Sequence, residues 1–151
     1  MKELNLLREL VSRQPYLQML GLEVLEAGPG WTKERLPFKP EFLQPYVLHG
    51  GVIYSLADTL AAHALATLIY PQEWLATVEQ KINFLRPVER DTIVGHGRVV
   101  HMGKRMVYSE AEIHNESGEL VAKSTATLVR LPSPSGRGRR EAPGEGLKET
   151  V

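Results

Sequence analysis

LHGGVIYSLADTLAAHALATLI, residues 48–69, decides the fold of this chain. Two glycines open the stretch, alanine and leucine dominate the rest, and apolar residues occupy nearly every helical face. We therefore predict one long helix from Val52 to about Ile69, which Pro71 ends. A helix that is apolar all round is buried on most sides, so other parts of the chain must cover it.

This apolar stretch is also about as long as a bilayer span, if it is extended to Val47–Tyr70. It carries His49, Asp58 and His63, and Asp58 lies near its middle, where a charge is costly in lipid. We interpret the stretch as a buried helix and expect no contact with a membrane. His63 is interpreted as a core histidine whose hydrogen bonds are satisfied.

Shorter elements precede the central helix. Helical spacing over Asn5–Ser12 and Pro15–Leu20 predicts two short helical segments, and Leu22–Ala27 and Trp31–Pro37 are predicted strands. The segment Phe38–Leu48 contains two prolines and is expected to be a loop.

Long strand-like runs follow the central helix, and apolar and polar residues alternate along them. They cover Trp74–Leu85, Thr92–Met102, Met106–His114 and Leu120–Leu131. The predicted class is α+β, with a long antiparallel sheet wrapped around one central helix. Such a layer leaves the other sheet face and part of the helix uncovered, which favours a dimer that extends the sheet.

Composition bounds the classes of function. The 151 residues suit one domain, and 18 Lys and Arg balance 18 Asp and Glu, so nothing favours nucleic acid as a partner. The absence of cysteine excludes disulfides, thiolate ligands and a cysteine nucleophile, and the histidines lack metal-ligand spacing. The N-terminus lacks the apolar core of a signal peptide, so we expect a cytoplasmic protein.

The last twenty residues differ in composition from the rest of the chain. PSPSGRGRREAPGEGLKETV, from Pro132 onward, is rich in Pro, Gly, Ser and charge. It cannot bury enough apolar surface to offset the entropy of ordering, so we predict a folded domain over 1–131 and a disordered tail over 132–151.

The start of the central helix carries the candidate chemistry. Gly50 and Gly51 let the backbone approach a ligand, and the free N–H groups of a first helical turn favour negative charge. Asp58 follows on an otherwise apolar helix, where a carboxylate is costly unless it is paired or used. His49 and Asp58 are separated by about 13.5 Å of helix rise, so they cannot meet within one helix. A site that uses both ends of this stretch must therefore lie between two subunits.

The pattern His-Gly-Gly, four residues, Leu-Ala-Asp resembles the signature of hotdog-fold acyl-CoA thioesterases of the phenylacetic-acid-degradation type. The resemblance covers roughly 15–131 and includes Tyr16-Leu17-Gln18-Met19-Leu20-Gly21 and Ile82-Asn83-Phe84-Leu85-Arg86-Pro87. It implies the hotdog fold and the hydrolysis of acyl-CoA to free acid and coenzyme A without a cofactor. It also implies a homodimer or homotetramer with active sites between subunits.

Site roles follow from this resemblance. Asp58 is the implied nucleophile or general base, the amide of Gly50 polarises the thioester carbonyl, and His49 orients the loop. Thr77 matches the Ser or Thr that assists the water or the carboxylate. Gln44, in Gln44-Pro45-Tyr46, lies where a shifted loop could supply the Asn or Gln that the family usually has.

Substrate-binding residues are predicted around these groups. Gly51 allows close approach of a ligand, and the acyl part is expected to lie against Tyr54 and its neighbours. Positive side chains flank the long strands and a glycine turn, where they would meet the phosphates of coenzyme A; they are Arg86, Arg98, Lys104 and Arg105.

Two other classes stay open, a non-catalytic acyl-CoA-binding hotdog module and a hotdog hydratase. The retained Asp58 argues against the first, and the absence of the hydratase pattern argues against the second. The sequence does not choose among aromatic, short and long acyl groups.

Overall fold

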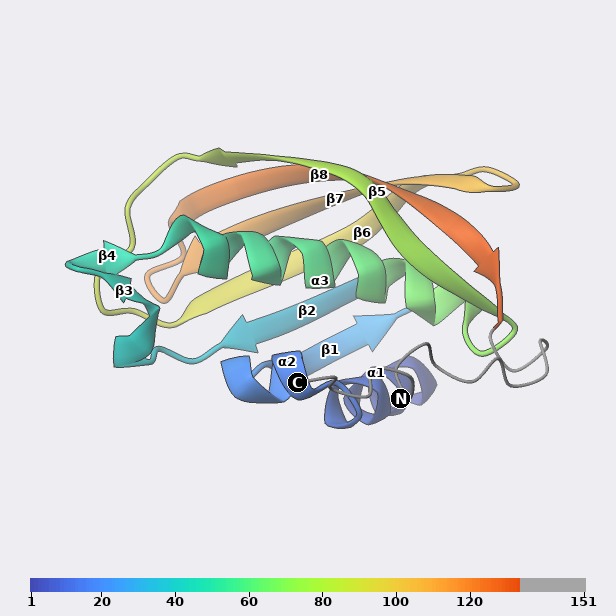
Figure 1. The fold of residues 1–151 in the computed structure, drawn as a ribbon, viewed down its shortest axis with the longest axis horizontal. Helices are drawn as coiled ribbons and strands as arrows, with labels where there is room; N and C mark the ends of the chain where they lie inside the picture. The colour runs from blue at the N-terminus through green and yellow to red at the C-terminus, as the bar shows by residue number, and fades with distance from the viewer. Residues whose placement is uncertain (134–151) are drawn as a thin grey trace, which may run out of the picture.

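In the computed structural model, which describes residues 1–133, the central helix α3 lies along one face of a six-stranded antiparallel sheet (Figure 1). The strand order is β1-β2-β6-β7-β8-β5. These strands are β1 (Glu23–Gly28), β2 (Trp31–Leu36), β5 (Glu73–Phe84), β6 (Ile93–Met102), β7 (Met106–Asn115) and β8 (Leu120–Pro132). The predicted sheet around one helix is therefore confirmed.

The helix α3 spans Gly50–Ile69, so it begins two residues before the predicted Val52. It buries Leu56, Leu60 and Leu65 almost completely. Glycine on β6 allows this close contact, because a Cβ at Gly97 would lie 2.4 Å from the carbonyl oxygen of Leu60. The helix therefore rests directly on the backbone of the sheet.

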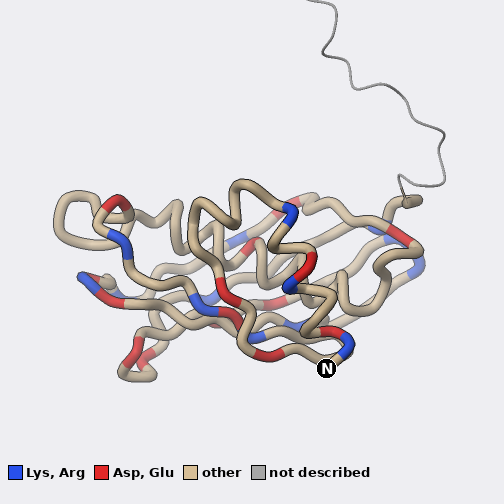
Figure 2. The backbone as a smooth tube through the Cα atoms, turned by 90° about the horizontal axis from the view of Figure 1, so that it is seen from below, with Lys and Arg blue, Asp and Glu red and all other residues tan. Residues whose placement is uncertain are grey.

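Within residues 1–133, only α3 is long and apolar enough to cross a membrane. However, 61% of the most apolar 18-residue stretch of this helix is buried inside the fold, as expected for a core helix. Figure 2 shows basic and acidic positions interspersed over the face seen from below, in line with the balanced composition.

Two helices precede the sheet, α1 (Lys2–Ser12) and α2 (Pro15–Leu20). The first begins three residues before the predicted Asn5 and packs against β1 through Leu7, Leu10 and Val11. Figure 1 shows both helices on the side of α3 that faces away from β7 and β8. The apolar layer they form closes the core around β1 and α3.

The prediction that Phe38–Leu48 is a loop was wrong in part. The segment holds a 3-10 turn over Pro40–Phe42 and a two-stranded hairpin of β3 (Leu43–Gln44) and β4 (Val47–Leu48). Pairing is possible because each strand has only two residues and the prolines stand outside them.

The strand β8 ends at Pro132, one residue into the segment predicted as a tail, because Pro132 pairs with Glu73. The remainder of the predicted tail, from residue 134 onward, lies outside the described residues.

Candidate active site

The loop before α3 is held by a local hydrogen bond. The Gly51 N–H donates to Nδ1 of His49 at 2.8 Å, so His49 is the N-cap of the helix. A Cβ at Gly51 would lie 2.9 Å from the same nitrogen, so a side chain there would displace the ring. The Gly50 N–H donates no hydrogen bond within residues 1–133. One amide thus fixes the loop, and the other stays available at the positive end of the helix.

Asp58 lies in the middle of α3, half-buried, and its carboxylate is held from β5. The Thr77 hydroxyl donates to Asp58 Oδ1 at 2.8 Å. With its amide nitrogen turned toward the same oxygen, Gln80 donates at 3.1 Å, and its amide oxygen accepts from Ser124 Oγ at 3.0 Å. No group within residues 1–133 donates to the second oxygen, Oδ2. The carboxylate is therefore fixed at one oxygen and open at the other.

A β-bulge aims both donors at the helix. Thr77 pairs with Leu128 and Glu79 pairs with Thr127, so Val78 is an extra residue on β5. In a regular strand, residues three apart point to opposite faces, but the bulge turns Thr77 and Gln80 to the same side. Sequence reasoning found Thr77 and missed Gln80, since the bulge follows from the register with β8.

Tyr54 adds a link between α3 and β5. Its hydroxyl donates to the carbonyl oxygen of Gln80 at 3.0 Å, one helical turn before Asp58. Ser55, next to it, donates its hydroxyl to Gly51 O and is hydrogen-bonded to the Tyr16 hydroxyl at 2.6 Å. These bonds place the predicted Tyr54 beside the carboxylate and connect α3 to the N-terminal helices.

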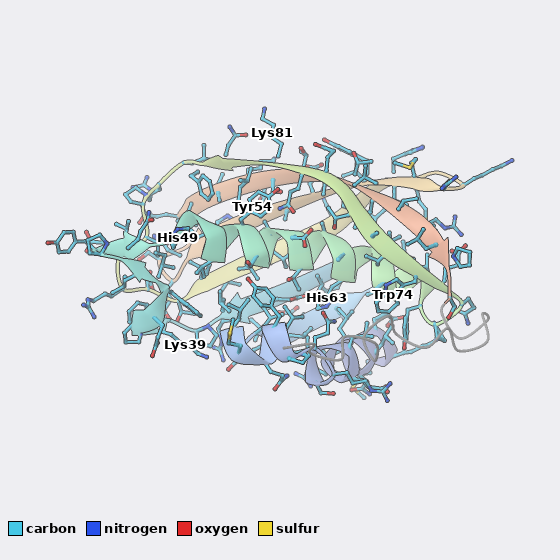
Figure 3. All side chains as sticks on the ribbon, viewed as in Figure 1. Lys39, His49, Tyr54, His63, Trp74 and Lys81 are labelled. Carbon is cyan, nitrogen blue, oxygen red and sulfur yellow. The ribbon has the colours of Figure 1, made fainter. Side chains whose placement is uncertain are left out.

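An apolar cavity of about 270 Å³ opens beside Asp58. Its walls come from α3, from the N-terminal helices and from the beginning of β5, and include Leu17, Tyr54, Ala62, Ile69 and Trp74. Figure 3 shows Tyr54 and His63 along α3, with Trp74 near the end of the helix. His63 also lines this cavity, although it lies five residues beyond Asp58.

Gly50 lies in a different cavity, of about 440 Å³, which is also lined by Gln44, Phe84 and Arg86. The two cavities have no lining residue in common, and eight residues of helix separate Gly50 from Asp58 by about 12 Å. The single chain therefore brings Asp58, Thr77 and Tyr54 together in one place, and Gly50, His49 and Gln44 in another.

The four predicted phosphate-binding side chains are spread over the chain. Arg86 lies near Gly50 and forms an ion pair with Glu119 at 3.0 Å. Arg98 lies on β6, where it pairs with Glu110 at 2.9 Å. Lys104 and Arg105 occupy the hairpin between β6 and β7, at the opposite end of the sheet from the start of α3 (Figure 1). Their side chains form no ion pair within the described part of the chain, so they are available to a ligand.

The chain resembles known proteins in both sequence and structure. The model of the thioesterase superfamily matches residues 46–122, which include α3 and β5, the strand whose side chains hold Asp58. A thioesterase structure from Haemophilus influenzae is 26% identical, with a TM-score of 0.78, and covers 85% of this chain and 90% of that one. The PaaI protein of the phenylacetic acid degradation operon of E. coli, at 24% identity, shares the fold with a TM-score of 0.80 over 87% and 95% of the two chains.

A curated relative is similar over most of its length. The 1,4-dihydroxy-2-naphthoyl-CoA hydrolase of Listeria monocytogenes is 27% identical over 113 residues, which are 74% of this chain and 92% of that protein.

Proposed function

The chain belongs to the thioesterase superfamily of hotdog-fold hydrolases, and from this premise we propose that it hydrolyses thioesters of coenzyme A, with Asp58 as the reacting carboxylate. The observation that carries the proposal is the asymmetric environment of Asp58. Thr77 and Gln80 hold Oδ1, while Oδ2 accepts no hydrogen bond within residues 1–133, and Asp58 lines the apolar cavity. One oxygen is therefore held in place, and the other is free to react with a ligand in the cavity.

Two routes of hydrolysis fit this carboxylate. In one, Oδ2 attacks the thioester carbonyl, the coenzyme A thiolate leaves, and water hydrolyses the resulting mixed anhydride to the free acid. In the other, Oδ2 removes a proton from a water molecule that attacks the carbonyl, and the same thiolate leaves. Both give one acid and one thiol per water consumed. Both need a donor for the oxyanion, and Gly50 N–H at the start of α3 is the available amide.

The oxyanion donor is proposed to come from a second subunit. The strand β5 is at the edge of the sheet and exposes Val78 and Phe84, and Leu85 directly after it is exposed too, which favours pairing with a second copy. Antiparallel pairing of β5 with its twofold mate would lay two α3 helices side by side in opposite directions. Gly50 of one subunit would then approach Asp58 of the other, and the two separate cavities would form one site. Assembly of such dimers into a tetramer is compatible with this arrangement.

The same pairing supports a location for coenzyme A. It would carry the hairpin with Lys104 and Arg105 of one subunit toward the Gly50 end of the other, beside Arg86. We propose that these side chains bind the phosphates, while Gly51, Tyr54 and the apolar cavity accept the pantetheine and acyl parts. Arg98 is a weaker candidate, because it lines a different cavity, beside Trp31 and His96, and not the one that contains Gly50 and Arg86.

Replacement of the carboxylate tests the proposal. Asp58→Asn keeps the shape and removes the charge, so we expect about a hundredfold loss of turnover in an assay of free thiol with a panel of acyl-CoA esters. The matched control is Asp91→Asn, because Asp91 lies between β5 and β6, where it accepts the backbone N–H of Glu116 at 3.2 Å and lines neither of the two cavities. Near-normal hydrolysis by Asp58→Asn would refute the assignment, and binding without hydrolysis by the unaltered protein would favour a non-catalytic module.

A further inference from the structure

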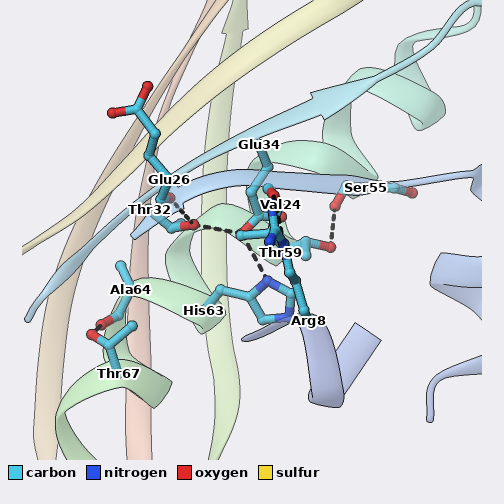
Figure 4. Close-up of polar contacts among 10 residues, drawn as sticks. All are labelled: Arg8, Val24, Glu26, Thr32, Glu34, Ser55, Thr59, His63, Ala64 and Thr67. Carbon is cyan, nitrogen blue, oxygen red and sulfur yellow. Dashed lines mark hydrogen bonds and ion pairs between the residues drawn. The ribbon is translucent and has the colours of Figure 1, made fainter. Parts of the chain in front are cut away.

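A buried carboxylate and a histidine form a polar pair beside the apolar cavity. Glu34 on β2 is fully buried, and its Oε1 lies 2.8 Å from Nδ1 of His63 on α3. The Thr32 hydroxyl donates to the same oxygen at 2.9 Å (Figure 4). A carboxylate only accepts, so the His63 Nδ1 carries the hydrogen of this bond. Glu34 thus fixes the orientation of the ring.

This orientation leaves the other ring nitrogen, Nε2, without a protein partner among residues 1–133, on a ring that borders the cavity. His63 is 4% exposed and lines the cavity that contains Asp58. Its Nε2 has no hydrogen-bond partner among residues 1–133 but is not fully buried. Glu34 Oε2, in contrast, is fully buried and has no partner. A polar nitrogen is therefore presented to a cavity whose walls are mostly apolar, at a position that packing alone would assign to a hydrocarbon side chain.

We propose that His63, held by Glu34, is a specificity-determining residue that binds a hydroxyl group on the acyl part of the substrate. A hydroxyl fits either form of the ring, because it can donate to a neutral Nε2 and accept from a protonated one. An unsubstituted hydrocarbon chain would cover Nε2 without a partner, which is unfavourable. The inference rests on the proposed function, since it takes the cavity beside Asp58 as the acyl site.

The helix sets the position of the hydroxyl along the acyl chain. Five residues separate Asp58 from His63, which corresponds to about 7.5 Å of rise, and the rotation of about 140° between them adds to that distance. An extended chain covers about 3.5 Å in three bonds, so the oxygen should lie at least about six bonds from the thioester carbonyl carbon. The geometry selects 6-hydroxyhexanoyl-CoA as a probe, with hexanoyl-CoA and 3-hydroxyhexanoyl-CoA as matched controls.

Hydrolysis of the three esters tests the proposal. The 6-hydroxy ester should have a kcat/KM about tenfold above that of hexanoyl-CoA, the scale of one hydrogen bond that is otherwise left unmade. The 3-hydroxy ester should show no such gain, because its oxygen lies too close to the thioester. Equal values for the 6-hydroxy and unsubstituted esters would overturn the proposal, as would an equal gain for both hydroxy esters.

A paired variant separates His63 from the rest of the cavity. Glu34→Met combined with His63→Leu removes both members of the pair, because removal of one member would leave an unpaired buried polar group. We expect the ratio of kcat/KM for the 6-hydroxy ester to kcat/KM for hexanoyl-CoA to fall from about ten to about one, because no ring nitrogen remains to bind the hydroxyl. A preference retained in the folded variant would overturn the proposal. If the variant does not fold, the rates of the unaltered protein with the three esters still decide whether the proposal holds.

Failure of this inference can be told apart from failure of the proposed function. If the protein hydrolyses neither these three esters nor any member of the acyl-CoA panel, the proposed function fails. Calorimetric affinities of the same protein for the same three esters then decide the role of His63. Binding of the 6-hydroxy ester about tenfold tighter than the other two supports it, and equal affinities overturn it.

Discussion

The Thr77 hydroxyl offers a sharp test of how Asp58 is held. Thr77→Val keeps the β-branched shape on β5 and removes the hydrogen bond of 2.8 Å to Asp58 Oδ1. A hydrogen bond to a charged group contributes about 1.5–3 kcal/mol. Because Thr77 is exposed in the single chain and Gln80 still holds the same oxygen, we take the lower part of that range, about 1.5–2 kcal/mol. This corresponds to a loss of about tenfold to thirtyfold in kcat.

The measurement is the initial rate of thiol release at saturating acyl-CoA, together with the thermal midpoint of each variant. Thr127→Val is the matched control, because the Thr127 hydroxyl donates to Glu79 at 3.0 Å and makes no contact with Asp58. We expect this control to stay within about twofold of the unaltered protein, as usual for a surface pair. A folded Thr77→Val protein with a normal kcat would refute the role assigned to Thr77.

Gln80 extends the same test. Gln80→Leu removes the second donor to Oδ1, so its single effect should resemble that of Thr77→Val. The double variant should lose more than the product of the two single effects, because either donor alone still restrains the carboxylate. Simple multiplication of the effects would show that the two side chains act independently and would contradict this interpretation.

Three further outcomes are expected. Mixing inactive Asp58→Asn with inactive Gly50→Pro should restore part of the activity, because a mixed dimer contains one complete site. Proline removes the amide of residue 50 and is tolerated at the first helical position, so the second variant should still fold. No recovery of activity after proven subunit exchange would exclude a shared site. Lys104→Ala with Arg105→Ala should raise KM for acyl-CoA more than it lowers kcat, and less so at high salt, which steady-state kinetics at two ionic strengths would check. Removal of residues 134–151 should leave the thermal midpoint and turnover unchanged, because Leu147 and Val151 are the only large apolar residues there. A lower midpoint would show that the domain extends beyond residue 133.

The sequence by itself determined the elements whose signals are local. The helix α3 and the long strands could be predicted because the period of apolar residues reflects which side of each element is buried. The loop at His49 is also local, since the cap joins residues two apart and Gly51 is needed beside the ring. The separation of His49 from Asp58 followed from helix rise alone, and the two separate cavities, one with Gly50 and one with Asp58, agree with it.

Other features depend on how distant segments meet. The hairpin β3–β4 is too short to leave a periodic signal. Gln80 reaches Asp58 only because a bulge opposite β8 reverses its side, and Glu34 meets His63 across 29 residues. In each case the pairing depends on the register of one strand against another element, which the whole core determines together. Local patterns therefore specified the helix that carries Asp58, whereas the tertiary structure decided which side chains surround it and which face the cavity.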